Sequence, residues 1–288
     1  MKNSRVLFTL SHVVLILISV AALIPFWLLI MASFTSEKSA INDGFKLIPK
    51  EFSLDAYRYL MAKWNLFGKG YLITISVTVV GVLLCVFITM AFGYMLSRPN
   101  LPLKRFWDFY VLFTMLFNGG LVATYTMYSQ TFHIKNTFFA YIVPNLLTSA
   151  FLIIMVKNYY RSNLPEELLE AARIDGSGEF YIFFKMALPL SKPMIATLGL
   201  MSAVSYWNDW TNGMYYIDNQ KMYGIQNILN AISSNTKYLM TGGGSAAALP
   251  AETARMGAAV FAILPILIIY PFFQDYFVKG ITMGAVKG

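Results

Sequence analysis

The side chains best suited to recognising a partner lie in one charged stretch, residues 166–193, between two hydrophobic blocks. Carboxylates stand at Glu166, Glu167 and Glu170, and two alanines follow directly. Carboxylates attract the Lys and Arg side chains of a second protein, and small residues allow another backbone to approach closely. This combination predicts a docking surface for a soluble partner rather than a reaction centre.

No group of residues suited to covalent or metal chemistry is visible in the sequence. His12 and His133 have no Cys or carboxylate neighbours at ligand spacing, and the single Cys85 lies inside a hydrophobic block, as small buried residues do. The sequence has no phosphate-binding Gly-x-x-x-x-Gly-Lys-Ser/Thr loop, no nucleophile elbow and no His-Glu-x-x-His pair. We therefore expect no catalytic residue, no metal site and no ATP bound to this chain, so that energy would arrive from another subunit.

The elements that must position the charged stretch are membrane helices. The chain of 288 residues is 57% hydrophobic and only 12% charged, whereas a soluble domain carries about 25% charged residues. A membrane-spanning helix needs about 20 apolar residues. The sequence therefore predicts an all-α membrane protein, with a single transmembrane domain over residues 1–288. Six transmembrane helices are expected, at about 11–33, 71–96, 106–129, 138–157, 194–217 and 257–279.

The distribution of Lys and Arg predicts the orientation in the membrane. The net charge is +8, but the basic residues are scattered at the ends of the blocks and form no dense patch for nucleic acid. The first block follows Lys2 and Arg5 and is too long for a signal peptide, so we expect an uncleaved span. More than half of the 22 basic residues then fall on one side. That side is predicted to be cytoplasmic and to hold both termini and the loop 158–193.

Two short helices are predicted in the loop 158–193. Asn163 is expected to cap the first helix, Pro165 to lie in its first turn and Gly176 to end it. The second is expected from Glu179 to Met186, and the two prolines that follow are expected to end it.

A helical wheel divides the first of these helices into a small face and a charged face. An amphipathic helix lying on lipid headgroups is the alternative interpretation, but anionic lipid would repel its acidic first turn. The pattern therefore favours docking of another protein. The small face holds Leu164, Leu168, Ala171 and Ala172, and the opposite face holds Glu166, Glu170 and Arg173.

The spacing of these residues resembles the EAA loop of ABC importer permeases. Glu170-Ala171-Ala172 is followed after three residues by Gly176, and a Leu-Pro-Leu run comes later, as in the sugar-importer version. The resemblance covers the whole chain and implies the type I ABC importer transmembrane-domain fold. The loop would then be a cytoplasmic coupling helix that contacts an ATPase. The residues implied for this coupling are Glu166, Glu167, Glu170, Ala171, Ala172, Asp175 and Gly176.

Two further stretches resemble carbohydrate permeases related to the smaller permease of the maltose importer. They are TyrTrpAsnAspTrp at 206–210 and PheAsnGlyGlyLeu at 117–121, and the second is most similar to permeases for complex oligosaccharides. The resemblance implies half of a carbohydrate translocation pathway in a bacterial plasma membrane, working by alternating access. It also implies four partners besides lipid: a second homologous permease, two ATPase subunits that bind ATP and Mg²⁺, and an extracytoplasmic sugar-binding protein.

Aromatic and polar side chains near the outer end of the fifth block are candidates for contacts with sugar. Acidic residues at membrane depth are usually functional, but an interfacial aromatic belt is an equal alternative. In the third block the glycine pair 119–120 predicts a broken or bent helix, and close helix packing is the alternative to a role in the path. The candidates are Asn118, Tyr206, Trp207, Asn208, Asp209, Trp210 and Tyr215.

One outer loop carries a glycine run. By resemblance it would reach into the cleft of the binding protein, and a plain solvent-exposed loop is the alternative. Two other functions stay open from the residues: a permease for amino acids or peptides, and a membrane-embedded enzyme or scaffold. The aromatic-rich fifth block disfavours the first, and the lack of polar clusters inside the blocks disfavours the second. The glycines are Gly242, Gly243 and Gly244.

Overall fold

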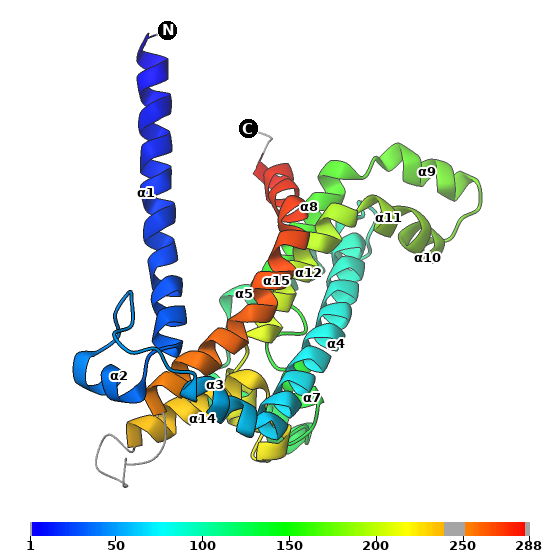
Figure 1. The fold of residues 1–288 in the computed structure, drawn as a ribbon. Helices are drawn as coiled ribbons and strands as arrows, with labels where there is room; N and C mark the ends of the chain where they lie inside the picture. Colours follow the sequence, from blue (N-terminus) through cyan, green and yellow to red (C-terminus); the bar gives the residue numbers. More distant parts are fainter. Residues whose placement is uncertain (1, 239–250, 286–288) are drawn as a thin grey trace. The chain divides into compact units, whose positions relative to one another are not determined.

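The computed structural model describes residues 2–238 and 251–285, and helices dominate this part of the chain (Figure 1). The described residues form no strand, only an isolated bridge between Thr35 and Phe52. The elements in order are α1 (Lys2–Ser33), α2 (Glu37–Asp43), α3 (Asp55–Ala62), α4 (Trp64–Ser97), α5 (Lys104–Leu116), α6 (Leu121–Thr126), η1 (Met127–Thr131), α7 (Phe139–Ile142), α8 (Ala150–Asn163), α9 (Glu166–Ile174), α10 (Glu179–Ile182), η2 (Phe183–Ala187), α11 (Leu188–Leu190), α12 (Lys192–Trp207), α13 (Thr211–Tyr216), η3 (Gln220–Met222), α14 (Ile225–Tyr238) and α15 (Ala251–Ala285).

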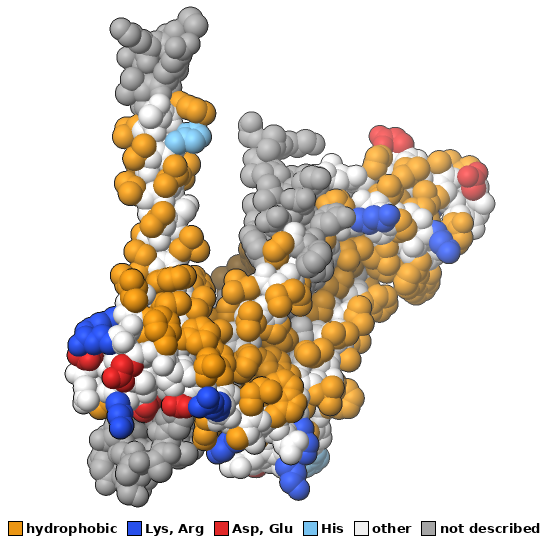
Figure 2. All heavy atoms as spheres, in the orientation of Figure 1, with side chains coloured by type: hydrophobic (Ala, Val, Ile, Leu, Met, Phe, Trp, Pro, Cys, Tyr) orange, Lys and Arg blue, Asp and Glu red, His pale blue; other side chains and the backbone are white. Residues whose placement is uncertain are grey.

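Three described helices are long and apolar enough to cross a membrane. They lie at Phe8–Ser33, Trp64–Ser97 and Glu252–Ile269. An α-helix satisfies its own backbone groups, which is what hydrocarbon requires. Its apolar side chains can then face lipid all round, and Figure 2 shows hydrophobic side chains along the whole described length of α1. The all-α membrane fold predicted from composition is confirmed in this part of the chain.

Two further hydrophobic blocks form bent helix pairs. Lys104–Leu116 and Leu121–Thr131 meet at 110°, and Glu179–Leu190 meets Lys192–Trp207 at 80°. The first bend falls on the predicted glycine break, because Gly120 has φ +83°. Counting each pair as one span gives up to five among the described residues.

The fourth predicted block, 138–157, is divided. Its helical parts are α7 and α8, and residues 143–149 between them are not helical. The count of six spans therefore stays a prediction.

The chain separates into two compact units. The first comprises Met1–Gly68 and Ile228–Pro265. Here the Glu37 carboxylate accepts hydrogen bonds from the backbone N–H groups of Glu252 and Thr253, each at 3.0 Å, and from the Thr253 hydroxyl at 2.6 Å. A carboxylate at a helix N-terminus satisfies unpaired N–H groups and complements the helix dipole, so Glu37 fixes the start of α15.

The second unit comprises Lys69–Asn227 and Ile266–Gly288, and small residues in α4 allow its helices to pack closely. A Cβ at Gly93 would lie 2.4 Å from Val156 of α8, and one at Gly81 would lie 2.5 Å from the ring of Tyr206 in α12. These glycines set the distance at which α8 and α12 approach α4. The charged loop joins α8 to α12, so this packing positions it.

Candidate functional site

The charged loop folds as two short helices around a turn. Figure 1 shows α9 and α10 beside the C-terminal end of α4. Glu166 and Glu167 occupy the first turn of α9 and Arg173 its last, so all three complement the helix dipole. Gly176 adopts φ +82° in the turn, a conformation that glycine takes without steric cost. The predicted pair of helices and the glycine turn are confirmed.

The predicted helix cap is wrong. Asn163 belongs to α8, and its side-chain amide donates to the Tyr159 carbonyl at 3.0 Å. The N-cap of α9 is Pro165, with extended backbone and no side-chain cap. Helix α8 continues further than the sequence suggested, because Tyr159 and Tyr160 bury its last turn against the rest of the unit.

The structure divides the small face predicted by the helical wheel. Within the chain, α9 buries Leu169 and Ala172, together with Leu164 just before it. Leu168 and Ala171 are exposed. The wheel treated the helix as isolated, whereas the packing of α9 onto α4 and α8 decides which residues are covered.

The second helix is longer than predicted. After α10 the chain continues without a break through the π-turn η2 and α11 to Leu190, and then bends at Ser191. Pro189 does not end it, and the proline lies at the start of α11, just after the π-helical turn η2. The bend separates the loop from α12, whose first turn holds Pro193.

The tip of the loop is open to a partner. Glu167, Glu170, Asp175 and Gly176 are exposed. Two large apolar side chains flank the turn, and both lie almost fully in solvent: Ile174 is 86% exposed and Phe180 is 84% exposed. Exposed apolar groups rimmed by charge are typical of protein interfaces. The sequence reasoning missed this pair, although hydrophobic residues on each side of the Gly176 turn were visible.

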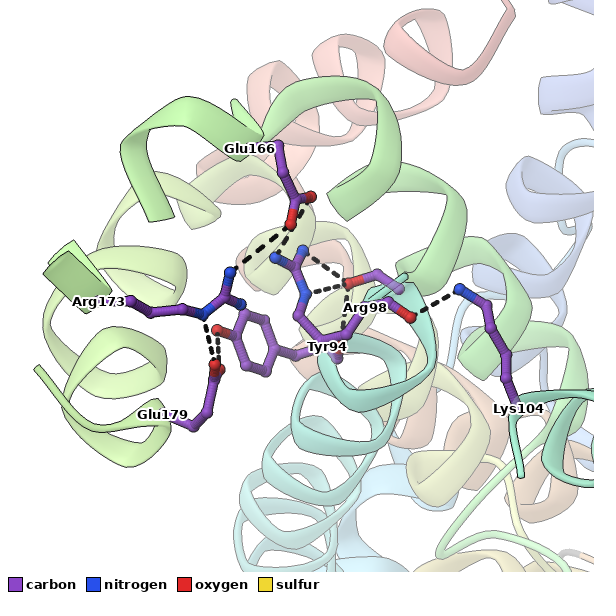
Figure 3. Close-up of polar contacts among 7 residues, drawn as sticks. Tyr94, Arg98, Lys104, Glu166, Arg173 and Glu179 are labelled. Carbon is purple, nitrogen blue, oxygen red and sulfur yellow. Dashed lines mark hydrogen bonds and ion pairs between the residues drawn. The ribbon is translucent and has the colours of Figure 1, made fainter. Parts of the chain in front are cut away.

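Tyr94 in the last turn of α4 and Arg98, the residue directly after this helix, contact the loop, and Figure 3 shows both side chains pointing into it. The Tyr94 hydroxyl donates to the Glu179 carboxylate at 2.9 Å. The Arg98 guanidinium lies 3.7 Å from Glu166, and Arg173 donates to Glu179 at 2.7 Å. We call these five residues the α4–loop cluster.

Charge and burial differ across the α4–loop cluster. Burial alone would raise the pKa of the Glu179 carboxyl, but hydrogen bonds from Arg173 and Tyr94 outweigh it and hold that pKa below its usual range. The Arg98 side chain is only 10% exposed, whereas that of Glu166 is 40% exposed. Arg98 therefore depends on protein partners, while the loop carboxylates also reach water.

The aromatic motif at the end of α12 is largely committed to the fold. Tyr206 is buried, and its hydroxyl donates to the Ile142 carbonyl at 3.0 Å. Trp207 is buried as well. One Asp209 oxygen accepts from the backbone N–H groups of Thr211 and Asn212, each at 3.1 Å, at the start of α13. These contacts are what an anchor for α13 requires.

Other members of the predicted substrate path are more accessible. Asn208 and Trp210 are exposed, and Tyr215 is partly buried. Asn118 is exposed too, and its side-chain oxygen accepts from the Gly120 N–H at 2.8 Å across the break between α5 and α6. The glycines 242–244 lie outside the described residues.

A mostly apolar cavity with a few polar groups lies where the fourth block is divided. Its volume is about 540 Å³, and amide and hydroxyl groups from two blocks line it together with apolar side chains. Irregular backbone at membrane depth is tolerated where it lines a cavity. The sequence analysis missed this cavity, although polar residues at 145–149 interrupt the fourth block. Its polar lining residues are Asn145, Ser149, Ser202 and Ser205.

Apolar spanning helices with a charged, partner-accessible loop define a multi-pass membrane protein that works with other subunits. The sequence profile of the family described as binding-protein-dependent transport system inner membrane component matches residues 89–283, which include the loop. The chain belongs to this family. Its members are permease subunits of transport systems, so the chain is a transport subunit and not itself an enzyme.

Relatives match over the whole length. The polygalacturonan/rhamnogalacturonan transport system permease protein YtcP of Bacillus subtilis (strain 168) is 37% identical over 291 residues and covers 100% of both chains. The arabinooligosaccharides transport system permease protein AraQ of Halalkalibacterium halodurans is 28% identical and covers 100% of this chain and 99% of its own. A chain in a crystal structure of a bacterial ABC transporter involved in import of the acidic polysaccharide alginate has TM-score 0.81 and 27% identity, over 96% and 98% of the two chains.

Proposed function

We propose that this chain is the permease subunit of a carbohydrate ABC importer. The observation that carries the proposal is the full-length similarity to permeases named for polygalacturonan and arabinooligosaccharide transport, together with the fold shared with the alginate transporter. Each of these names describes a system for a sugar polymer or oligomer. An oligosaccharide, most closely an acidic one of the pectin or alginate kind, is therefore the substrate class that we infer.

In this proposal the loop formed by α9 and α10 couples the permease to an ATPase. The exposed carboxylates and the flanking Ile174 and Phe180 would enter a cleft on the ATPase surface. Apolar anchors surrounded by charged groups supply affinity and register in such interfaces. Closure of two ATPase subunits around ATP and Mg²⁺ would then move the loop and switch the spans between inward-facing and outward-facing states. The Gly176 turn forms the bend between the two arms of the loop on which the partner can act.

The proposal requires a second, homologous permease, because one chain forms half of a pathway. It also requires an extracytoplasmic binding protein that delivers the sugar. The loop then lies on the cytoplasmic side, as do both termini, in line with the distribution of Lys and Arg. The candidates for substrate contact in this chain are the exposed Asn208 and Trp210 and the polar groups of the cavity beside Asn145.

Charge reversal at the loop tip tests the coupling role. Glu170→Lys should leave membrane insertion and assembly with the second permease intact while abolishing stimulation of the ATPase by the loaded binding protein. Asp55→Lys is the control, because Asp55 is an exposed carboxylate in the first turn of α3, outside the loop of α9 and α10. Normal coupled ATPase activity in Glu170→Lys would exclude the docking role.

The substrate class is tested separately. The binding protein of the same system should bind acidic oligosaccharides, such as oligogalacturonate, more tightly than neutral oligosaccharides of equal length. Isothermal titration with both sets measures the difference. A preference for amino acids or peptides would replace the carbohydrate assignment and leave the importer architecture standing.

A further inference from the structure

We infer that Tyr94 and Arg98 are positioning residues that make the loop of α9 and α10 and the end of α4 move as one body. The inference rests on the proposed coupling function of the loop. It adds that movement imposed on the loop passes to α4 through the α4–loop cluster as well as through the covalent connections to α8 and α12.

The C-terminal end of α4 contacts the loop at two points. Tyr94 lies in the last turn of the helix, and Arg98 follows its last residue, Ser97, directly. Figure 3 shows both side chains turned toward the loop. Tyr94 contacts Glu179 at the start of α10, and Arg98 contacts Glu166 at the start of α9. A single helix end therefore holds both arms of the loop.

The turn between α9 and α10 is closed by an ion pair. Gly176 and Gly178 would let the two arms change their angle. Arg173, in the last turn of α9, donates to Glu179 at 2.7 Å and lies 3.8 Å from Glu166. This ion pair crosses the turn and ties the arms to each other. Since Glu179 also accepts from Tyr94, the carboxylate joins both arms and α4 at one point.

Separating Arg98 from the loop is costly in free energy. Its guanidinium donates to the Ser97 hydroxyl and lies 4.7 Å from the centre of the Tyr94 ring, so α4 holds it in place. Among the described residues, Glu166 is the carboxylate within ion-pair distance of Arg98. A guanidinium buried to this degree is strongly destabilised when its counter-ion leaves. Separation of the loop from α4 is therefore disfavoured, whereas movement of the two together is not.

Packing supports the same conclusion. Tyr94 contacts the rings of Tyr160 and Phe183, at centroid distances of 5.5 and 5.3 Å. Leu169 and Ile182, one from each arm, are fully buried in the same hydrophobic cluster. Close-packed interiors transmit displacement rather than absorb it.

The experiment measures the distance between the loop and α4 in the assembled importer. Spin labels are placed at Lys185→Cys in the loop and at Leu83→Cys in α4, two exposed positions, in a Cys85→Ser background. The distance is recorded without nucleotide and after trapping with ATP and vanadate, so no sugar is needed. If loop and helix move together, the two states should differ by about 2 Å or less, the scale of small helix shifts.

Two variants then break the connection to different degrees. Tyr94→Phe removes one hydroxyl and keeps the ring packing, so it should still fold, and Tyr181→Phe is its control on an exposed ring of the loop. Arg98→Gln removes the buried charge, and its control is Arg105→Gln, at an exposed arginine nearby. In both cluster variants the distance between the loop and α4 should differ between the two nucleotide states. The effect of nucleotide trapping on the position of α4 should fall about fivefold or more. Neither control should show these changes.

The outcomes separate this inference from the proposed function. A purely structural role would lower the thermal stability of Tyr94→Phe yet leave its distance unchanged in both nucleotide states, and that result would overturn the inference. So would a wild-type distance that already changes strongly on trapping. If instead no ATPase associates with the loop, or Glu170→Lys retains coupled activity, the proposed function fails first.

Discussion

The loop of α9 and α10 and the aromatic motif at the end of α12 both looked functional, yet the fold uses them differently. In the loop, the polar side chains meet one another at a partly exposed surface, and the apolar Ile174 and Phe180 are left in solvent. In the motif, Tyr206 is buried and bonded to backbone. The comparison teaches that an aromatic residue of a conspicuous motif serves packing when its polar atom already has a partner inside the chain, as the Tyr206 hydroxyl does.

Removal of the Tyr206 ring tests the comparison most directly. Tyr206→Ala should lower the free energy of unfolding by about 3–5 kcal/mol, as for other large aromatic side chains removed from a core. The fall in the thermal unfolding midpoint of the protein in detergent measures this effect, and size-exclusion chromatography of the same samples accompanies it. Trp210→Ala is the control, because Trp210 is 44% exposed and its removal leaves no comparable cavity. Equal stability of the two variants would show that Tyr206 is not an anchor.

The turn in the loop gives the next largest effect. Gly176→Ala should destabilise the bend by about 1–2 kcal/mol, because an L-residue is strained at positive φ. No atom lies within 4 Å of the added Cβ, so strain alone is responsible. Gly178→Ala is the matched control, since Gly178 has φ −75° and equally open surroundings. Protease cleavage of the loop, compared between the two variants, reports the difference.

Asp209 tests whether the aromatic motif has a role besides anchoring α13. Asp209→Ala should lower the free energy of unfolding by about 1 kcal/mol through loss of the hydrogen bonds at the start of α13, as for other helix caps. Asp209→Asn keeps an acceptor oxygen and should retain most of this stability. If transport by the assembled importer falls in Asp209→Asn while the unfolding midpoint holds, the carboxylate charge has a role in the path beyond anchoring.

The smallest expected effect is the pH dependence of the loop. The pKa of Glu179 is below its usual value of 4.5, so its stabilising contacts are fully present above pH 4.5. They should be lost as the pH falls below 4.5 through the lowered pKa of the folded state. The unfolding midpoint of wild type minus that of Glu179→Gln, measured from pH 6 to pH 3, should shrink only in the acid part of that range. A constant difference would contradict the assignment.

Sequence reasoning predicted the elements better than their contacts. Block hydrophobicity located α1, α4 and α15, and the glycine pair located the break between α5 and α6. The helix pair in the loop followed from Gly176 and the flanking acidic and apolar residues. Each of these features depends on local composition or on backbone freedom, which neighbouring residues in sequence control.

Two of the differences have one physical cause. The cap at Asn163 and the face of Ala171 were assigned as if α9 stood alone, but α8 continues through Asn163, and α9 buries Leu169 and Ala172 while Ala171 stays exposed. Long-range packing decided both, and one sequence carries little information about long-range packing. Pro189 was expected to end a helix that continues to Leu190, and this difference is local to the backbone around the proline.

By itself the sequence determined the membrane-embedded, helical character of the chain and the place of its charged loop, because hydrophobic blocks, charge and glycine act locally. Only the tertiary structure decided which polar residues are available. It turned Tyr206 inward, left Ile174 and Phe180 outside, and brought Tyr94 and Arg98 to Glu179 and Glu166 across some 70 to 85 residues of sequence. Such pairings form only when distant helices pack, since burial and counter-ion distance are properties of the assembled unit.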